Sequence, residues 1–291
     1  MNTLSRSRNA LASLRRASGT PLARQSIASI PSRALPAYPG HIPLSRFENA
    51  FMAVGSGLMS LANPRRGDMV AALGETTAGS SLTRWRDAML ADDEGRKVLR
   101  DRPTVNTDTV DMAYLASLPE NTFGYSYFRW LERCGVTPDS REPVHYINDP
   151  ELAYVMQRYR ESHDFYHTIC GLPTSIRYEL ALKAFEFANL GLPMSGLGAL
   201  LGPLRISAKH RAELIGQYYP WALRCGAASK HVMTVYWEEK WEMDADDLRA
   251  ELGIWSPPPA VWPKRPLTEA AVMARRKAEQ QQRQQEHTPL S

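Results

Sequence analysis

The stretch ESHDFYHTICGLPTSIRYE, residues 161–179, decides how this chain folds and where its chemistry lies. Successive residues of an α-helix advance by about 100° around its axis. His163, Asp164 and His167 therefore lie on one face, within a single turn. Two imidazoles and a carboxylate that converge in this way are candidate ligands of a metal ion.

The residues that follow this face predict a reversal of the chain. Gly171-Leu172-Pro173 stops the helix, and Thr174 or Ser175 is a natural N-cap for the next one. Glu179 then lies about one turn into the second helix, at a height where it can face His167. We therefore expect a helical hairpin that brings four potential ligands together.

The donor set favours certain metals. Two neutral imidazoles and two carboxylates suit zinc, and less specifically iron or manganese. If all four residues bind, the site is closed. If Asp164 or Glu179 stays outside the first shell, a position opens for water or substrate, and the metal can act there as a Lewis acid.

Two other kinds of metal site use similar residues. The metalloprotease pattern HExxH is not matched, because Asp164 stands where the glutamate belongs and no third ligand follows at the usual interval. Phosphohydrolases of the HD type pair adjacent His and Asp residues, but they also need a further upstream histidine and a distant aspartate. His145 is the only nearby upstream candidate, so this interpretation is weaker.

The rest of the chain predicts an all-α protein with a single helical domain over residues 42–256. Apolar residues recur at helical spacing between proline and glycine breaks, and hardly any alternating stretch is long enough for a strand. The expected helices are Ser45–Leu61, Arg66–Leu73, Ser80–Leu90, Ala91–Asp101, Thr109–Ser117, Thr122–Cys134, Asp149–Ile169, Thr174–Leu190, Ser207–Ala227, Val232–Glu242 and Ala245–Leu252.

The N-terminus has the composition of a mitochondrial transit peptide. Residues 1–33 contain six arginines and no acidic residue, and they can form a short basic amphipathic helix. Removing these six charges from the formal net charge of +4 leaves −2 on the rest. The rest of the chain therefore lacks the basic character that nucleic-acid binding requires.

Composition bounds the remaining features. With 291 residues and 43% apolar content, the chain can bury a core without crosslinks. Cys134, Cys170 and Cys225 are odd in number and widely spaced, which argues against a disulfide framework and a cysteine-based zinc site. Residues 257–291 are expected to form a proline-rich strap and a polar, glutamine-rich tail.

An uncharged segment, FANLGLPMSGLGALLGPL at 187–204, is long enough to touch the lower limit for a membrane span. Its four glycines and two prolines argue against a continuous helix. Two interpretations stay open: an apolar flap that meets a bilayer or a lipid-like ligand, and a buried connection between helices.

At these residues the sequence resembles the coenzyme Q (ubiquinone) biosynthesis protein 4 family, whose hallmark is HDxxH, eleven residues and Glu. The hallmark is intact from His163 to Glu179. The resemblance covers about residues 42–256. Further family-like strings are RPTVNT at 102–107, LPENTFGYSY at 118–127, FEFANLGLPMSGLGALLGPLR at 185–205, YYPWALRCG at 218–226 and VYWEEKWEMDADDLRAELGI at 235–254.

The resemblance implies an all-helical protein bound peripherally to the matrix side of the mitochondrial inner membrane. It implies Zn²⁺ at His163, Asp164, His167 and Glu179, and membership of the complex of coenzyme Q synthesis enzymes. The implied reaction is C1 decarboxylation of 4-hydroxy-3-methoxy-5-polyprenylbenzoate to 2-methoxy-6-polyprenylphenol, plain or coupled to C1 hydroxylation. The implied partners are the other enzymes of the complex, the polyprenylated aromatic precursor and the lipid surface, with no nucleic acid; a homo-oligomer is a further option.

A positioned acid is needed to protonate C1 of the ring. The candidates are a metal-bound water, Tyr178, and whichever of Asp164 and Glu179 is not a ligand. Three cationic side chains could steer the substrate carboxylate: Arg177, Lys183 and Arg205. The alternative to an enzyme is a non-catalytic scaffold in which zinc pins two helices and apolar surface binds lipid precursor and partner enzymes.

Overall fold

The structure is a computed structural model that describes residues 35–63 and 66–262, and the regular structure of these residues is helical. No strand occurs among them, and an isolated β-bridge joins Thr122 to Asp244. The all-α class is confirmed. The α-helices of the described residues are α1 (Arg46–Ala62), α2 (Gly67–Thr77), α3 (Gly79–Ala91), α4 (Asp93–Asp101), α5 (Met112–Ser117), α6 (Phe123–Cys134), α7 (Pro150–Ile169), α8 (Ile176–Leu190), α9 (Pro193–Leu201), α10 (Ala208–Glu213), α11 (Tyr219–Ala228) and α12 (Ala245–Leu252).

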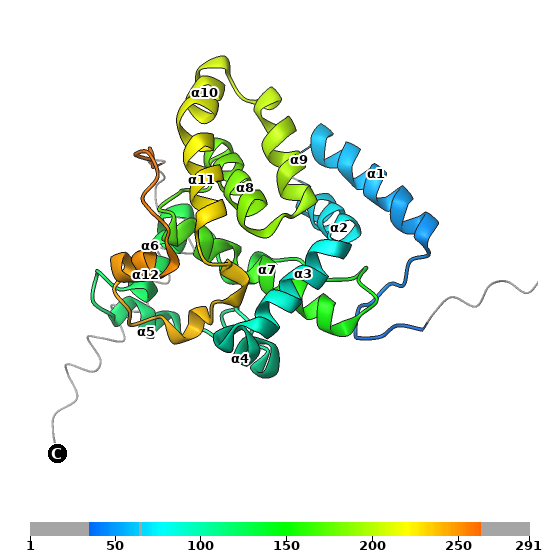
Figure 1. Ribbon diagram of the computed structural model, residues 1–291, viewed down its shortest axis with the longest axis horizontal. Helices are drawn as coiled ribbons and strands as arrows, with labels where there is room; N and C mark the ends of the chain where they lie inside the picture. The colour runs from blue at the N-terminus through cyan, green and yellow to red at the C-terminus, as the bar shows by residue number, and fades with distance from the viewer. Residues whose placement is uncertain (1–34, 64–65, 263–291) are drawn as a thin grey trace, which may run out of the picture. The chain divides into compact units, whose positions relative to one another are not determined.

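The predicted pair of helices around the HDxxH motif is present as α7 and α8 (Figure 1). Asp149 caps α7 by accepting hydrogen bonds from two backbone N–H groups of the first turn, and Pro150 occupies the first helical position. Gly171 adopts a φ of +64°, a left-handed conformation that favours glycine and ends the helix. The chain then turns into α8, as the sequence predicted.

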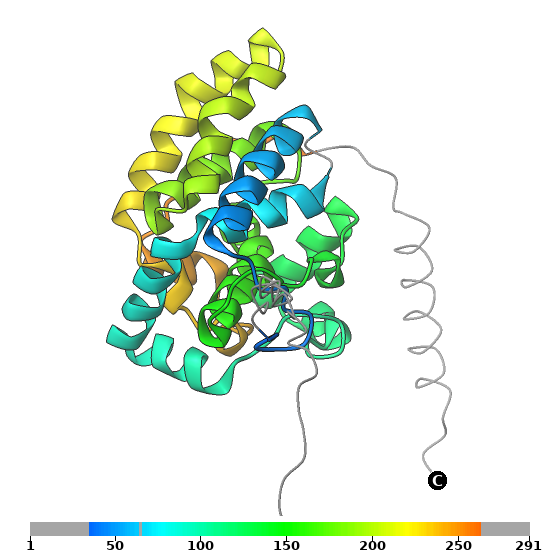
Figure 2. The same cartoon turned by 90° about the vertical axis from the view of Figure 1, so that its right-hand side faces the viewer.

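Helix α7 lies in the middle of the described residues, between α3 and α6 (Figures 1 and 2). Most of its side chains are buried, in agreement with a helix that is covered on several sides. Phe165 packs against the rings of Phe123, Tyr127 and Trp237, with centroids 4.8–5.8 Å apart. The helix face that carries His163 and His167 therefore belongs to a helix packed into the aromatic core.

Helix α8 packs against α9 and α11, and α1 lies on α2, which in turn contacts α9. The indole Nε1 of Trp85 on α3 donates a hydrogen bond to the carbonyl of Leu190 at the end of α8. These contacts place α2, α7, α8 and α9 around one region of the interior. That region contains the candidate site.

The helix predicted over Val232–Glu242 is wrong. The chain forms two short 3-10 turns there, Val232–Thr234 and Trp237–Glu239. Val232, Met233, Val235 and Trp237 are all buried, and an α-helix of the same length would turn some of these positions toward solvent. Burial of nearly every apolar side chain therefore overrides the local preference.

The uncharged segment 187–204 is buried in one part and exposed in another. Gly191 breaks it between α8 and α9 with a φ of +66°. Leu192 and Ser195 are fully buried, whereas Leu200 and Leu204 are more than two-thirds exposed. Among the described helices, none is long and apolar enough to cross a membrane.

Some of the predicted segments cannot be compared with the structure. The expected transit peptide, residues 1–33, lies outside the described residues, and so does the polar tail after residue 262. The described part of the proline-rich strap, 257–262, contains no helix. Its Pro259 carbonyl accepts a hydrogen bond from the Tyr218 hydroxyl, which ties the strap to the end of the π-helical turn Leu214–Tyr218.

Candidate metal centre

Three of the four predicted ligands come together. Ligand atoms of His163, His167 and Glu179 all lie within 4.8 Å of one another. The Nε2 atoms of His163 and His167 lie 3.5 Å and 3.1 Å from the two carboxylate oxygens of Glu179. The histidines come from α7 and the glutamate from the first turns of α8, so the cluster bridges the two helices as predicted.

The other nitrogen of each imidazole is held by a hydrogen bond. His163 Nδ1 lies 2.7 Å from a carboxylate oxygen of Glu186, and His167 Nδ1 lies 3.1 Å from the carbonyl oxygen of Leu172. A backbone carbonyl only accepts, and an ionised carboxylate only accepts. Both imidazoles must therefore carry a proton on Nδ1. Each Nε2 then has a free lone pair if the ring is neutral, or a second proton if the ring is a charged imidazolium.

The pKa values of Glu179 and Glu186 are both lowered. Burial raises the pKa of Glu179, but the adjacent His167 and His163 outweigh burial and hold that pKa well below its usual range. Burial likewise raises the pKa of Glu186, and the neighbouring Lys183 and His163 outweigh it and lower the pKa. The site therefore presents carboxylates to both sides of His163.

This arrangement fits a cation. With neutral imidazoles, two nitrogen lone pairs and a carboxylate point at one another with no donor between them, which is unfavourable unless a positive charge lies at the centre. The buried Nε2 of His167 forms no well-aligned hydrogen bond, although a Glu179 oxygen lies 3.1 Å from it. Two imidazole nitrogens and a carboxylate are a common ligand set for a divalent metal with an open position.

Asp164 lies apart from this cluster. Its side chain is almost completely buried and forms an ion pair with Arg141, which comes from the loop between α6 and α7. A buried carboxylate needs such a partner, because an unpaired charge in the interior is costly. The structure thus brings His163, His167 and Glu179 together and places Asp164 beside them, against Arg141.

A cavity of about 300 Å³ opens against the cluster. Three cationic side chains lie on its wall: Arg141, Arg160 and Lys183. Burial lowers the pKa of Lys183, but Glu186 outweighs burial and raises it, so the ammonium stays charged. The complete lining is Gly67, Val70, Ala71, Gly74, Arg141, Glu142, Met156, Tyr159, Arg160, His163, Glu179, Lys183 and Met194.

Three other residues named from the sequence lie elsewhere. The hydroxyl of Tyr178 accepts hydrogen bonds from Arg177 and from the backbone N–H of Val261 on the strap. Arg177 also forms an ion pair with Glu213. Arg205 donates to the carbonyl of Leu61. Of the cationic residues considered from the sequence, Lys183 is therefore the one that reaches the cavity.

Sequence reasoning did not single out Glu186, Arg141 or Arg160. A signal for Glu186 exists, because Glu179, Lys183 and Glu186 are spaced i, i+4 and i+7 and share one helical face. Arg141 comes from a loop far from the motif along the chain, and nothing in its local sequence indicates the contact.

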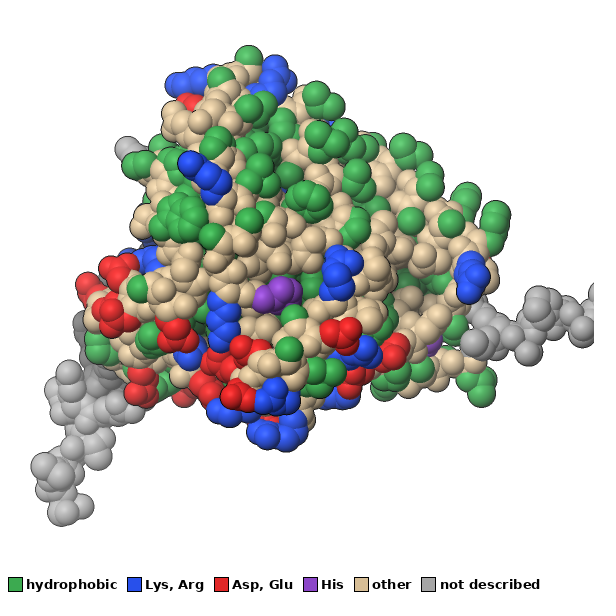
Figure 3. All heavy atoms as spheres, viewed as in Figure 1, with side chains coloured by type: hydrophobic (Ala, Val, Ile, Leu, Met, Phe, Trp, Pro, Cys, Tyr) green, Lys and Arg blue, Asp and Glu red, His purple; other side chains and the backbone are tan. Residues whose placement is uncertain are grey.

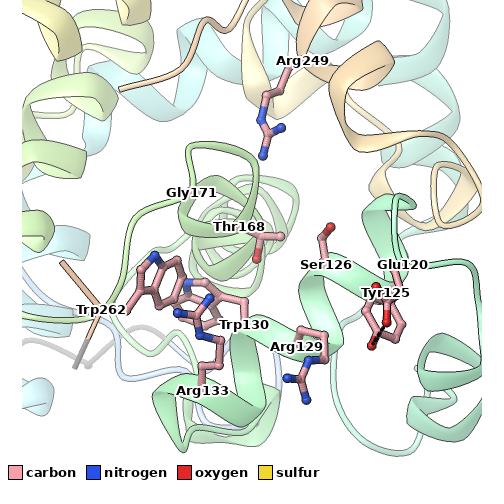
Figure 4. Close-up of a pocket in the computed structure, with 10 residues that line it drawn as sticks. All are labelled: Glu120, Tyr125, Ser126, Arg129, Trp130, Arg133, Thr168, Gly171, Arg249 and Trp262. Atoms are coloured by element: carbon pink, nitrogen blue, oxygen red, sulfur yellow. Dashed lines mark hydrogen bonds between the residues drawn. The ribbon is translucent and has the colours of Figure 1, made fainter. Parts of the chain in front are cut away.

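A second hollow of about 220 Å³ is lined by Trp130, Thr168 and Trp262, among other residues (Figure 4). None of the three clustered ligands lines it. Its lining residue Trp130 stacks on the His167 ring with centroids 5.1 Å apart and donates a hydrogen bond to the Leu172 carbonyl, which His167 also uses. Figure 4 shows Arg133 lying against Trp262, 3.8 Å from its ring centroid. Trp130 therefore supports His167, but the hollow is not the cavity that His163 and Glu179 line.

Comparisons with known proteins identify the family of this chain. The family model of coenzyme Q (ubiquinone) biosynthesis protein Coq4 matches residues 38–258. Proteins named mitochondrial ubiquinone biosynthesis protein COQ4 from Laccaria bicolor and Coprinopsis cinerea are 63% and 56% identical, over 84% and 92% of this chain and 82% and 90% of their own lengths. A solved crystal structure of a Nostoc punctiforme protein has a TM-score of 0.56 at 21% identity, covers 72% of this chain and 99% of that one, and supports the helical fold. The chain belongs to the Coq4 family of coenzyme Q (ubiquinone) biosynthesis proteins.

Proposed function

We propose that this protein acts in ubiquinone biosynthesis as a zinc-dependent carboxy-lyase. It removes the C1 carboxylate of 4-hydroxy-3-methoxy-5-polyprenylbenzoate and yields 2-methoxy-6-polyprenylphenol. The observation that carries the proposal is the cavity in which His163 and Glu179 lie on the same wall as three cationic side chains. A carboxylate substrate suits such a wall, since its oxygens can accept from the N–H groups that the protein contacts of these cations leave free.

The metal would be held by the Nε2 atoms of His163 and His167 and by the Glu179 carboxylate. When bound, it supplies a Lewis acid on the cavity side, where three protein ligands leave a position open. The resemblance also implies Asp164 as a ligand. With its carboxylate paired to Arg141, it acts in this proposal from outside the metal shell.

Cationic side chains of the protein would bind the substrate carboxylate and so orient the ring. Arg160 donates to the carbonyls of Glu142 and Ala71 and to the carboxylate of Glu75, so its guanidinium is fixed on the wall. Lys183 adds an ammonium beside it. C1 takes up a proton, with electron density supplied from the para oxygen. The C1–carboxyl bond then breaks, CO2 leaves, and the electron pair of that bond restores the aromatic ring. The hydroxyl of Tyr178 is bound to Arg177 and the strap and does not line the cavity, so it is not the proton donor.

The polyprenyl tail requires contact with a membrane, because each CH2 group exposed to water costs about 0.8 kcal/mol. Helix α1 offers this contact. Phe47, Phe51, Val54 and Leu58 recur at helical spacing on its outer face and are 64–80% exposed. In the view of Figure 3, apolar side chains gather over the upper part of the molecule, where Figure 1 shows α1, α9 and α10. Acidic side chains gather over the lower part.

Helix α2 lines the cavity and also supports α1, which carries the apolar surface. Val70 on α2 and Met194 on α9 line the cavity, and α2 carries α1 on its other side. We place the protein peripherally on the matrix side of the mitochondrial inner membrane, among the other enzymes of coenzyme Q synthesis. The same apolar surface favours the competing function, a scaffold that holds lipid precursor and partner enzymes without catalysis.

The test is CO2 release from 4-hydroxy-3-methoxy-5-prenylbenzoate in liposomes, with zinc-loaded protein and without oxygen. Release by the wild type and not by His163→Ala supports the carboxy-lyase. If CO2 is released only in the presence of oxygen, the reaction is an oxidative decarboxylation and not a plain one. If the folded, metal-bound protein releases no CO2 either with or without oxygen, the carboxy-lyase proposal is overturned in favour of the scaffold.

A further inference from the structure

Glu186 is a completely buried carboxylate on α8. Its Oε1 lies 2.7 Å from His163 Nδ1 on α7. Its Oε2 accepts hydrogen bonds at 2.7–2.9 Å from the Lys183 ammonium, the Tyr159 hydroxyl and the Ser195 hydroxyl. One carboxylate therefore ties three helices, α7, α8 and α9, to one metal ligand.

All four partners are donors, and this determines what Glu186 can do. Only an ionised carboxylate accepts four hydrogen bonds at once, whereas a glutamine would turn an NH2 group toward at least one donor. The carboxylate also forces the proton of His163 onto Nδ1. The Nε2 lone pair then points toward Glu179, 3.5 Å away, where the metal would lie.

The cavity wall depends on the same group. Glu186 does not line the cavity, but His163, Lys183 and Tyr159 do. The Lys183 ammonium donates to Glu186 and, at 3.1 Å, to Tyr159, which leaves its third N–H group for the cavity. Lys183 would therefore meet a substrate anion at a place that Glu186 fixes.

We propose that Glu186 is the positioning residue of this site: it sets the metal-facing tautomer of His163 and anchors Lys183 and Tyr159 on the cavity wall. The inference rests on the proposed metal centre. Glu186 would act on the metal and the substrate indirectly, through His163 and Lys183. An outer partner of a histidine ligand commonly changes metal affinity by about 10–100-fold. The effect of Glu186 should lie in that range.

The test compares Glu186→Gln with Ser195→Ala. Ser195→Ala removes one of the donors to Glu186 without touching His163, and is the matched control. We expect Glu186→Gln to weaken Zn²⁺ and Co²⁺ binding about 10–100-fold and to shift the visible bands of the cobalt-loaded protein. Ser195→Ala should leave both unchanged. Equal affinity and equal spectra for Glu186→Gln and wild type overturn the proposal.

A second measurement decides if Glu186→Gln does not fold. In wild-type protein with ¹⁵N-labelled histidine, NMR reports which ring nitrogen of His163 carries the proton. The Nδ1–H tautomer is expected, and the Nε2–H tautomer overturns the proposal. These readouts do not involve CO2. A wild type that binds metal through an Nδ1-protonated His163 but releases no CO2 refutes the carboxy-lyase alone.

Discussion

The carboxylate of Asp164 is almost completely buried and forms an ion pair with Arg141, which lines the cavity beside His163 and Glu179. Asp164 follows His163 directly, yet its charge is paired with a residue from another part of the chain. The pair connects the motif helix to the loop between α6 and α7. The roles of Asp164 and Glu179 should therefore differ.

Asp164→Asn and Glu179→Gln remove the same charge in different places. We expect Glu179→Gln to weaken zinc binding by about 100-fold or more, and Asp164→Asn by no more than about tenfold. Asp164→Asn should instead destabilise the fold by about 3 kcal/mol, because Arg141 loses its buried partner. Competition with a chromogenic chelator and denaturant unfolding measure the two effects. Equal losses of zinc affinity would make Asp164 a ligand.

Removing the metal should lower stability without unfolding the protein. The cluster bridges α7 and α8, but the core around Phe165 and Trp237 does not depend on it. Zinc at 100 times its dissociation constant should add about 2.7 kcal/mol to the free energy of unfolding. Circular dichroism and thermal unfolding with and without chelator measure this. His163→Ala should no longer be stabilised by zinc, whereas the control His210→Ala, at an exposed histidine, should be. Loss of helix in the metal-free protein would instead favour a structural metal.

The sequence contained most of the site. The helical spacing of His163 and His167, with the glycine turn and Glu179, was enough to predict the cluster, because local periodicity determines which side chains share a face. Arg141 and Arg160 could not be found this way, since their contacts depend on how a distant loop and α2 pack on α7. The failed helix over Val232–Glu242 has the same cause: tertiary burial overrode local preference there.

The outer face of α1 should determine lipid binding. Phe51 is 73% exposed, so Phe51→Ser should leave the fold intact and weaken binding to vesicles of phosphatidylcholine and cardiolipin by about tenfold or more. Leu90 on α3 is also exposed, outside this stripe, and Leu90→Ser is the control. Sedimentation with vesicles measures the binding. The same loss in both variants would remove α1 as the contact surface.

His231 should contribute to acid sensitivity. Burial lowers the pKa of this imidazole to about 4, and its Nδ1 is buried without a hydrogen-bond partner. Between the ordinary pKa of 6.5 and this value, the unfolded chain takes up a proton that the folded protein does not. Stability is therefore fully present above about pH 6.5 and falls toward pH 4.

His231→Leu removes this titration. As the pH falls from 7 to 4.5, the variant should lose about 1–2 kcal/mol less of its free energy of unfolding than the wild type, allowing for the partial exposure of the ring. Urea unfolding across this pH range measures the difference. Parallel curves for the two proteins would show that His231 is not responsible.

The central claim is one metal ion between α7 and α8, and anomalous diffraction at the zinc edge from crystals of the zinc-loaded protein tests it most directly. The account predicts a single peak about 2.0–2.2 Å from His163 Nε2, His167 Nε2 and a Glu179 carboxylate oxygen, with its open side toward the cavity. No peak at this position in zinc-loaded crystals, or zinc held by other residues, would contradict it.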